Sequence, residues 1–196
     1  IRPLQEDQAV DAVFGSHRAH PSHPKYLDEW MTAHFNGFKG KAIYRKSDSL
    51  GDYYLESPRH RQFMHYYSDN NSCLRKESWM QHPYPDVFYG EDQLWADWVI
   101  QADGVKAFAE DAIVFHSHDY TEREEYERAR TEAFFFLKYF GYKLGQNRFD
   151  IELGIEKEAR KILQASDDHM KEHKRHILAL QRAKREGYVV GCQEYE

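Results

Sequence analysis

The chain has 196 residues, enough for one domain of ordinary size with a buried core. Aromatic residues make up 15% of it, and charged residues make up 31% and hold the mean hydropathy at -0.88, so we expect a soluble protein with an aromatic core. The formal net charge of -6 argues against general nucleic-acid binding, because phosphate contacts favour a basic surface.

The two cysteines, Cys73 and Cys192, lie far apart and match no metal-binding spacing, which favours a reduced cytoplasmic chain. No apolar run approaches the roughly 20 residues that span a bilayer, and no signal peptide is visible. The sequence begins with Ile1 rather than methionine, so we expect a fragment of a longer protein.

Residues 10–15 are short and apolar and end in glycine, which predicts a buried strand. Three histidines follow at spacings of three, namely His17, His20 and His23. The prolines among them break any helix that would put the three on one face, so we interpret the segment as a polar loop. A metal-ligand role for one of the three is the alternative.

Apolar residues recur at helical spacing over residues 26–38, which predicts an amphipathic helix. Residues 39–58 are polar and contain two glycines, which indicates a long ordered loop of the kind that often serves as a functional lid. Residues 59–67 fit a short helix or a strand equally well.

A dense polar run covers residues 68–76 and leads into a helix that starts near Glu77. One interpretation is a turn with Ser72 or Ser78 as the helix N-cap. The other is a ligand-facing segment, in which amide side chains and Arg75 hold an oxygen-rich substrate, because such a run cannot enter a core unless its polar groups are paired.

Residues 83–88 read as an extended connection, since a residue before proline avoids the helical region. Glu91 and Asp92 then open a helix that ends near Gly104. Acids in a first turn are favoured by the helix dipole, so they could be purely structural. They could equally present a carboxylate base to a cleft.

Two short strands are predicted over residues 106–108 and 112–115, and the second delivers His116 and His118. Residues two apart in an extended segment point to the same face, so both imidazoles could enter one cleft. A structural role for either histidine is the alternative.

From residue 121 onward the pattern is helical, with Thr121 as an N-cap followed by acids and Gly141 as the end of the first helix. A second long helix is predicted over residues 150–186, with basic residues crowding its end. This basic end reads as a solvated face, or as a surface for a partner subunit or anionic lipid, and it is compatible with a homo-oligomer.

Four segments in this order resemble the C-terminal half of a family 2 glycosyltransferase, with closest similarity to bacterial rhamnosyltransferase-like members. They read VDAVFGSH, SDNNSCLRKESW, PYPDVFYGEDQLWA and AIVFHSHDY. The resemblance covers roughly residues 10–120 and implies an α/β fold. Residues 1–120 would form the C-terminal part of a GT-A (Rossmann-like) domain, and residues 121–196 a helical extension of two long helices.

The resemblance implies an inverting transfer of a sugar, with rhamnose as the leading candidate, from a nucleotide-diphosphate donor to a glycan hydroxyl. Asp92 would be the general base, with Glu91 beside it. His116, with His118 in reserve, would bind a divalent metal, Mn²⁺ or Mg²⁺, that offsets charge on the departing diphosphate. The substrate-binding residues it implies are Asp69, Asn70, Asn71, Arg75 and Trp95.

The implied partners are a nucleotide-sugar donor and a glycan or lipid-linked saccharide acceptor, with no nucleic acid, in the cytoplasm or at the inner face of the cell membrane. The nucleotide-binding strands and the Asp-x-Asp motif of a complete enzyme are not found ahead of Val10, so we expect this chain to be inactive alone. One alternative is a non-catalytic binding or assembly module. Another is a metal-dependent hydrolase using His116 and His118, which lacks a well-spaced third ligand.

Overall fold

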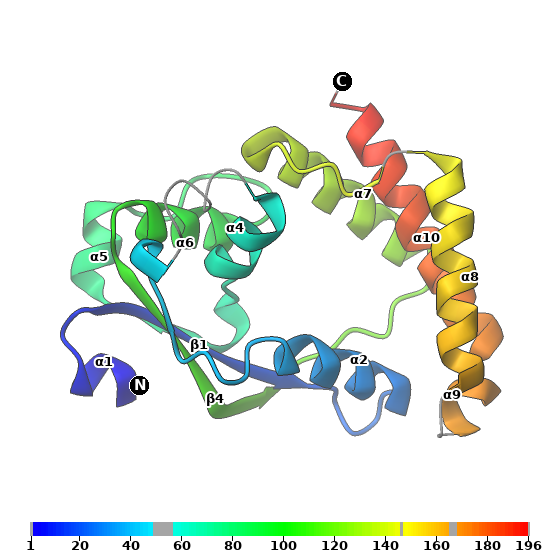
Figure 1. Cartoon of the computed structure of the whole chain (residues 1–196), viewed down its shortest axis with the longest axis horizontal. Helices are drawn as coiled ribbons and strands as arrows, with labels where there is room; N and C mark the ends of the chain where they lie inside the picture. Colours follow the sequence, from blue (N-terminus) through cyan, green and yellow to red (C-terminus); the bar gives the residue numbers. More distant parts are fainter. Residues whose placement is uncertain (1, 49–56, 146, 165–167, 196) are drawn as a thin grey trace. The chain divides into compact units, whose positions relative to one another are not determined.

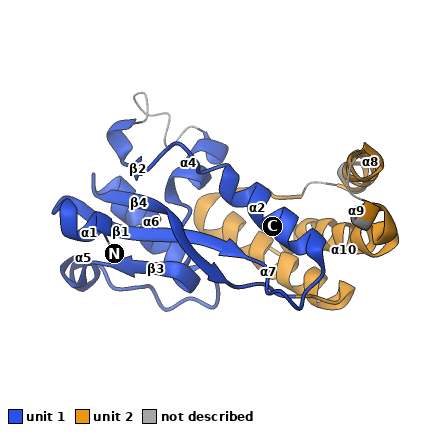
Figure 2. Cartoon of the chain, turned by 90° about the horizontal axis from the view of Figure 1, so that it is seen from below, with its two compact units in different colours: residues 1–118 blue, residues 119–196 orange. Residues whose placement is uncertain are grey.

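The structure, a computed structural model, describes residues 2–48, 57–145, 147–164 and 168–195. The chain divides into two compact units, unit 1 (Ile1–His118) and unit 2 (Asp119–Glu196), which are described separately (Figure 2). Unit 1 is a mixed α/β structure and unit 2 is helical, which confirms the α/β class with C-terminal helices. Among the described residues, no helix is long and apolar enough to cross a membrane.

Unit 1 is built on an open four-stranded sheet with the order β2-β4-β1-β3. The two central strands are parallel, and each outer strand runs antiparallel to its neighbour; all four strands are labelled in Figure 2. The bounds of the strands are β1 (Val10–Arg18), β2 (Ile43–Tyr44), β3 (Ser72–Leu74) and β4 (Val105–Phe115). The helices of this unit are α1 (Arg2–Glu6), α2 (Lys25–Asn36), α4 (Pro58–His65), α5 (Lys76–Gln81) and α6 (Glu91–Gln101), with 3-10 turns η1 (Lys46–Asp48) and η2 (Asp69–Asn71).

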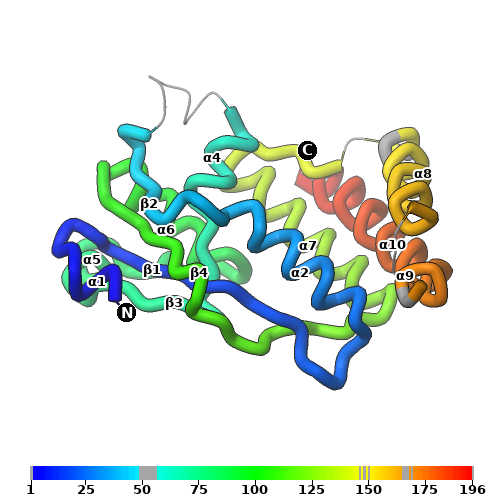
Figure 3. Tube along the Cα trace, turned by 60° about the horizontal axis from the view of Figure 1, so that its bottom comes forward, coloured from blue at the N-terminus to red at the C-terminus, as the bar shows by residue number. Residues whose placement is uncertain are grey.

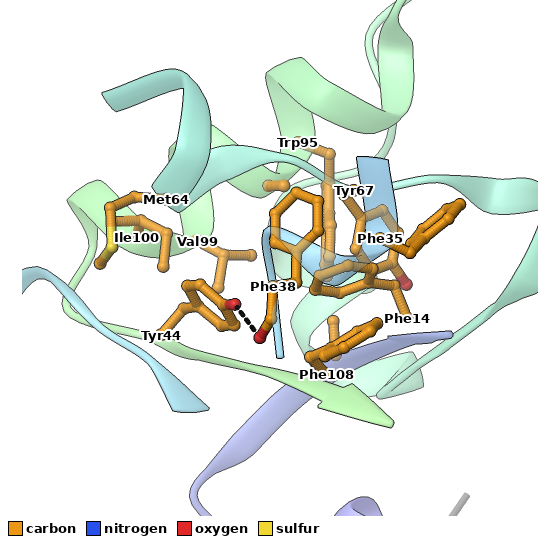
Figure 4. Packing of buried hydrophobic residues seen from close by; sticks show 12 residues of the cluster. Phe14, Phe35, Phe38, Tyr44, Met64, Tyr67, Trp95, Val99, Ile100 and Phe108 are labelled. Carbon is orange, nitrogen blue, oxygen red and sulfur yellow. Dashed lines mark hydrogen bonds between the residues drawn. The ribbon is translucent and has the colours of Figure 1, made fainter. Parts of the chain in front are cut away.

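The main core lies on one face of the sheet. Phe14 of β1 and Phe108 of β4 pack there against Phe38 and Trp95, and the helices α2, α4 and α6 supply most of the rest (Figure 4). Alternate residues of the same strands point to the other face, as the two-residue repeat of a strand requires. There they pack with Leu4 of α1.

The prediction of two strands over residues 106–108 and 112–115 was wrong, because β4 is one continuous strand. Its pairing with β1 shifts register between Gly15 and Ser16, where residues 110–112 form a bulge that leaves them unpaired. The acidic Glu110 and Asp111 interrupt the apolar pattern there, but the backbone keeps its direction. β1 is likewise longer than expected and includes His17, which was assigned to a loop.

The serine caps predicted for the helix near Glu77 were also wrong. The N-cap of α5 is Arg75, with no side-chain hydrogen bond to the helix. Ser72 lies in β3, and Ser78 lies inside α5, where its hydroxyl donates to Asp11 Oδ1 at 2.6 Å. The polar run therefore forms the 3-10 turn η2 and the edge strand β3, and neither serine caps α5.

The secondary structure predicted between residues 26 and 67 is partly confirmed. The helix over residues 26–38 is confirmed as α2, and residues 59–67, left undecided, are mostly helix α4. The loop expected over residues 39–58 contains β2 and η1, while its residues 49–56 lie outside the described residues.

Unit 2 consists of the helices α7 (Glu122–Phe140), α8 (Arg148–Gln164), α9 (Asp168–Glu172) and α10 (Lys174–Gln193). The predicted start and end of the first helix are confirmed, because Thr121 and Glu124 form a capping box and Gly141 ends α7 in the left-handed conformation. The single helix expected over residues 150–186 was wrong, since α8, α9 and α10 divide this stretch. The apolar spacing inside each helix is correct, but spacing alone does not show where a chain turns back.

The helices α7 and α10 lie side by side and run in the same direction (Figure 3). Gly187 and Gly191 allow this close approach. A Cβ atom on Gly187 would lie 2.4 Å from the Tyr126 carbonyl oxygen, and one on Gly191 would lie 2.1 Å from the Arg130 carbonyl oxygen. These glycines explain why two helix backbones can approach one another so closely.

Candidate functional site

The candidate site is organised around the N-terminus of α6. Gly90 precedes this helix with φ of 71°, a left-handed conformation that favours glycine. The chain can therefore turn sharply out of the extended segment before it and enter the helix at Glu91. The predicted placement of Glu91 and Asp92 in the first turn is confirmed.

Both carboxylate oxygens of Asp92 accept backbone hydrogen bonds. The N–H of Gln93 donates to Oδ1 at 2.7 Å, and the N–H of Asp69 donates to Oδ2 at 3.2 Å. The second bond joins the polar run to the start of α6, although the two residues are 23 apart in sequence. The geometry thus brings Asp69 and Asp92 together, and their roles in binding and catalysis stay predictions.

Burial raises the pKa of Asp92 to about 6. The two backbone N–H bonds act against this shift, because they stabilise the ionised carboxylate, whereas the negative charges of Asp69 and Glu91 add to it. Asp92 is therefore mostly ionised at neutral pH and still basic enough to take up a proton. A carboxylate with a pKa near the working pH has the property that general-base catalysis needs.

Tyr84 is a site residue that sequence reasoning missed. Its hydroxyl donates to Asp69 Oδ1 at 2.6 Å, and the Ser72 hydroxyl donates to the same oxygen at 3.2 Å. The Tyr84 ring lies edge-on to Trp95 at 5.7 Å, and burial raises the pKa of its hydroxyl, so the hydroxyl stays protonated and keeps donating. The available signal was the Pro-Tyr-Pro sequence, whose restricted backbone fixes this tyrosine in an extended segment just before the acids.

The side-chain amides of both asparagines in the predicted substrate-binding set donate to groups of the protein itself. Asn71 donates from Nδ2 to the carbonyl oxygens of Ser16, at 3.0 Å, and Ala112, at 2.8 Å. These carbonyls lie at the bulge between β1 and β4, so Asn71 satisfies groups that the sheet leaves unpaired. Asn70 donates to the Ser68 hydroxyl at 3.3 Å.

Arg75 and Trp95 also have structural roles. The Arg75 guanidinium donates to the carbonyl oxygens of Val10 and Leu4 at 2.6 Å and of Asp7 at 2.9 Å, so it ties α1 to the start of β1. Trp95 is fully buried, and its indole N–H donates to the His82 carbonyl at 2.8 Å. The substrate contacts assigned to these two residues stay predictions.

His116 and His118 lie just beyond β4, next to the end of β1. Their ring centroids are 4.9 Å apart, and the ring of His17 from β1 lies 5.4 Å from that of His116. Because the carboxyl ends of two parallel strands meet at one edge of the sheet, the structure brings His17 to the predicted pair. Sequence reasoning missed this approach, for which a histidine at the end of each of two predicted strands was the available signal.

Burial is also the main influence on the pKa values of His17 and His116. His17 is only 5% exposed, and its Nε2 atom has no hydrogen-bond partner within the part of the chain that the structure describes. Burial lowers the pKa of His17 to about 4, with the charges of His116 and His34 adding to the effect, and it lowers the pKa of His116 as well. The rings of His17 and His116 are therefore neutral at pH 7, the form in which imidazole binds metals.

These residues do not make a complete metal site. Over the residues described, no group of three or more His, Cys, Asp or Glu side chains is arranged to hold a metal ion. Imidazole nitrogen suits zinc and similar transition metals, whereas Mg²⁺ prefers oxygen ligands. The assignment of Mn²⁺ or Mg²⁺ to His116 and His118 stays a prediction.

The neighbouring histidines bind a serine rather than joining the cluster. The Ser117 hydroxyl lies 2.7 Å from His23 Nδ1 and accepts the backbone N–H of His20 at 2.9 Å, while the His20 ring nitrogen Nδ1 lies 2.7 Å from the Ser22 hydroxyl. This arrangement fixes the turn after β1 against the segment after β4.

No protein-family model, curated protein or solved structure matches the chain.

Proposed function

We propose that unit 1 is the acceptor-binding and catalytic half of an inverting glycosyltransferase. It would move a sugar, with rhamnose the leading candidate, from a nucleotide-diphosphate donor to a hydroxyl of a glycan or lipid-linked saccharide. The observation that carries the proposal is Asp92, a half-buried carboxylate at a helix N-terminus with a pKa raised to about 6. The resemblance of the four sequence segments to family 2 glycosyltransferases supports the substrate class.

In the proposed reaction, the Asp92 carboxylate removes the proton of the acceptor hydroxyl as its oxygen attacks the anomeric carbon of the sugar. The bond from that carbon to the diphosphate breaks, and the nucleoside diphosphate leaves with the bonding electrons. Attack from the opposite face inverts the anomeric centre. A divalent metal held by His116 and His118 would offset charge on the departing diphosphate, although no group of three or more such ligands is found among the described side chains.

The remaining polar groups of the site support the base. The Asp69 backbone N–H holds one oxygen of Asp92 at 3.2 Å, while Tyr84 and Ser72 hold the Asp69 side chain. Asp69 therefore acts twice on Asp92. Its N–H orients the carboxylate, and its negative charge helps to keep the pKa high.

The test is sugar transfer by the natural protein at the length that its gene encodes. Purified enzyme is incubated with a panel of nucleotide-diphosphate sugars and oligosaccharide acceptors, and release of nucleoside diphosphate is followed. Asp92→Asn keeps the size of the side chain but removes the base, so we expect transfer to fall by about 10²–10⁴-fold while donor binding is retained. Transfer by this variant at the wild-type rate would remove Asp92 from the role of base.

A second candidate, a non-catalytic binding or assembly module, is favoured by one observation. Both oxygens of Asp92 already accept backbone hydrogen bonds, as they would in a purely structural helix start. This reading predicts that Asp92→Asn lowers stability and that no donor in the panel is turned over by the wild-type protein. The same assay, with a thermal melt of both proteins, separates the two candidates.

A further inference from the structure

The helix α8 in unit 2 has apolar residues on two opposite faces. Ile151 and Ile162 are buried, and with Gly154 they form the face turned into the unit. On the outside, Phe149 is 73% exposed and Leu163 is 60% exposed. A helix on a protein surface needs only one apolar stripe, so the outer one requires an explanation.

The outer residues lie on one line along the helix. At 3.6 residues per turn, Phe149, Leu153, Glu156, Arg160 and Leu163 all fall within about 40° of the same direction. Leu153 is 39% exposed, and Glu156 and Arg160 form an exposed ion pair at 3.5 Å in the middle of the line. We call these five residues the outer stripe of α8, the yellow helix in Figure 1.

We propose that the outer stripe is an interface between two copies of this chain, in which two α8 helices pair antiparallel about a two-fold axis. With the axis at the level of residue 158, Leu153 faces the partner subunit's Leu163, and Glu156 faces the partner subunit's Arg160. Because the two-fold axis generates each contact twice, two leucine pairs flank two ion pairs. Such self-complementarity is what an isologous dimer interface requires.

The charges select both the orientation and the partner. A parallel pair would put Glu156 beside Glu156 and Arg160 beside Arg160, and such like-charge contacts are unfavourable. A lipid surface is a poorer occupant, because α8 carries four basic residues (Arg148, Lys157, Arg160, Lys161) and four acidic ones (Asp150, Glu152, Glu156, Glu158) and so lacks the basic excess that anionic membranes attract.

The first experiment measures the oligomeric state of the whole chain by sedimentation velocity over a range of concentrations. We expect a concentration-dependent dimer. Two single variants reverse one charge each, Glu156→Lys and Arg160→Glu, and either should weaken association by roughly tenfold or more, since each puts like charges opposite one another. The matched control is Lys161→Glu, which makes the same charge change as Arg160→Glu on the same helix but about 100° away from it.

Mixing the two weakened variants gives the sharpest test. Glu156→Lys carries two positive charges on its stripe and Arg160→Glu carries two negative ones, so an antiparallel heterodimer regains both ion pairs. We expect the mixture to dimerise although neither variant does so alone. A wild-type chain that stays monomeric, variants that dimerise as well as wild type, or a mixture that does not associate would each overturn the proposal.

A final measurement addresses the other occupant of an apolar face. Flotation with vesicles of phosphatidylcholine and phosphatidylserine should leave the wild-type chain unbound. Vesicle binding that Leu163→Lys abolishes, in a chain that does not dimerise, would assign the stripe to lipid and overturn the proposal. Far-ultraviolet circular dichroism of each variant checks that its helices are intact.

Discussion

At the scale of single residues, the site depends on how tightly one carboxylate is surrounded. Asp92 receives two backbone hydrogen bonds that favour its charge, yet burial and two neighbouring acids raise its pKa to about 6. The neighbour that matters most is Asp69, which Tyr84 holds in place at 2.6 Å. Substituting the Asp69 side chain therefore changes the pKa of Asp92 without altering the Asp92 side chain itself.

We expect Asp69→Asn to lower the pKa of Asp92 from about 6 toward its ordinary value of 3.8. The substitution removes a negative charge but keeps the backbone N–H that binds Asp92. The measurement is a carboxyl ¹³C NMR titration of the whole chain. Glu91→Gln is the control and should lower this pKa less, because Glu91 contributes less to the shift; an unchanged or raised pKa in Asp69→Asn would contradict the argument.

Lys106 is a second residue whose charge is controlled by burial. It is fully buried, its ammonium group lies 4.9 Å from the centre of the Phe14 ring and 5.0 Å from that of Tyr44, and it donates to the Tyr66 carbonyl. Burial lowers its pKa well below the ordinary 10.5. The folded chain then binds fewer protons than the unfolded chain at every pH between the lowered pKa and 10.5.

This difference in proton binding makes the free energy of unfolding rise with pH, by up to about 1.4 kcal/mol per pH unit for one group. We expect Lys106→Met to remove this contribution, so that its stability rises less steeply than that of wild type as the pH increases toward 10.5. The measurement is urea unfolding at several pH values. Lys39→Met removes an exposed lysine and should keep the wild-type slope; equal slopes in all three proteins would contradict the prediction.

At the scale of elements, unit 2 is set by how closely α7 and α10 approach. Gly191→Ala would place a Cβ 2.1 Å from the Arg130 carbonyl oxygen, and a backbone atom cannot move aside easily. We expect a loss of about 1–3 kcal/mol or more in the stability of this unit, measured by urea unfolding followed by circular dichroism.

Gly154→Ala is the matched control for this prediction. Its new Cβ would meet the end of the flexible Arg185 side chain, which can shift, and alanine favours a helix over glycine by about 1 kcal/mol. We expect this variant to keep close to wild-type stability. A Gly191→Ala protein as stable as Gly154→Ala would show that the helices do not pack as closely as described.

The elements of unit 1 show how short connections position the site. An ion pair between Arg61 of α4 and Asp97 of α6, 2.6 Å apart, joins these two helices. Asn71 fixes η2 to the bulge in β4, and the Asp69 N–H joins η2 to Asp92 at the start of α6. The predicted substrate-binding residues are thus largely residues that shape the site.

At the scale of the whole molecule, the two units have separate cores. The four tryptophans, Trp30, Trp79, Trp95 and Trp98, all lie in unit 1, whereas unit 2 is rich in helix. Tryptophan fluorescence therefore reports on unit 1 alone, and circular dichroism at 222 nm reports on both units. A chain with two cores need not unfold in one step.

We expect Gly191→Ala to lower the thermal midpoint seen by circular dichroism while the midpoint seen by tryptophan fluorescence stays at its wild-type value. The reason is that the substitution acts only on the packing of α7 against α10. The two midpoints are measured in one scan of the full chain, with wild type as the reference. Equal decreases in both would show that the units unfold as one cooperative structure.

Local chemistry determined much of this protein from its sequence. The capping box at Thr121, the glycine end of α7, the apolar spacing of α2 and the first-turn acids of α6 each depend on residues within a few positions of one another, and all are confirmed. The resemblance to a glycosyltransferase half rests on short segments of the same kind, and the function it implies stays a proposal.

Only the tertiary structure decided which of these residues meet. In the folded chain Tyr84 contacts Asp69, and His17 contacts His116. The Arg75 guanidinium donates hydrogen bonds to carbonyl oxygens up to 71 positions away, and three helices replace the single one expected. Hydrogen bonds and burial across such separations depend on how strands and helices pack. The periodicity and local spacing of residues do not determine that packing. The raised pKa of Asp92, which depends on burial and on the distant Asp69, could therefore not be predicted from the Glu91-Asp92 sequence alone.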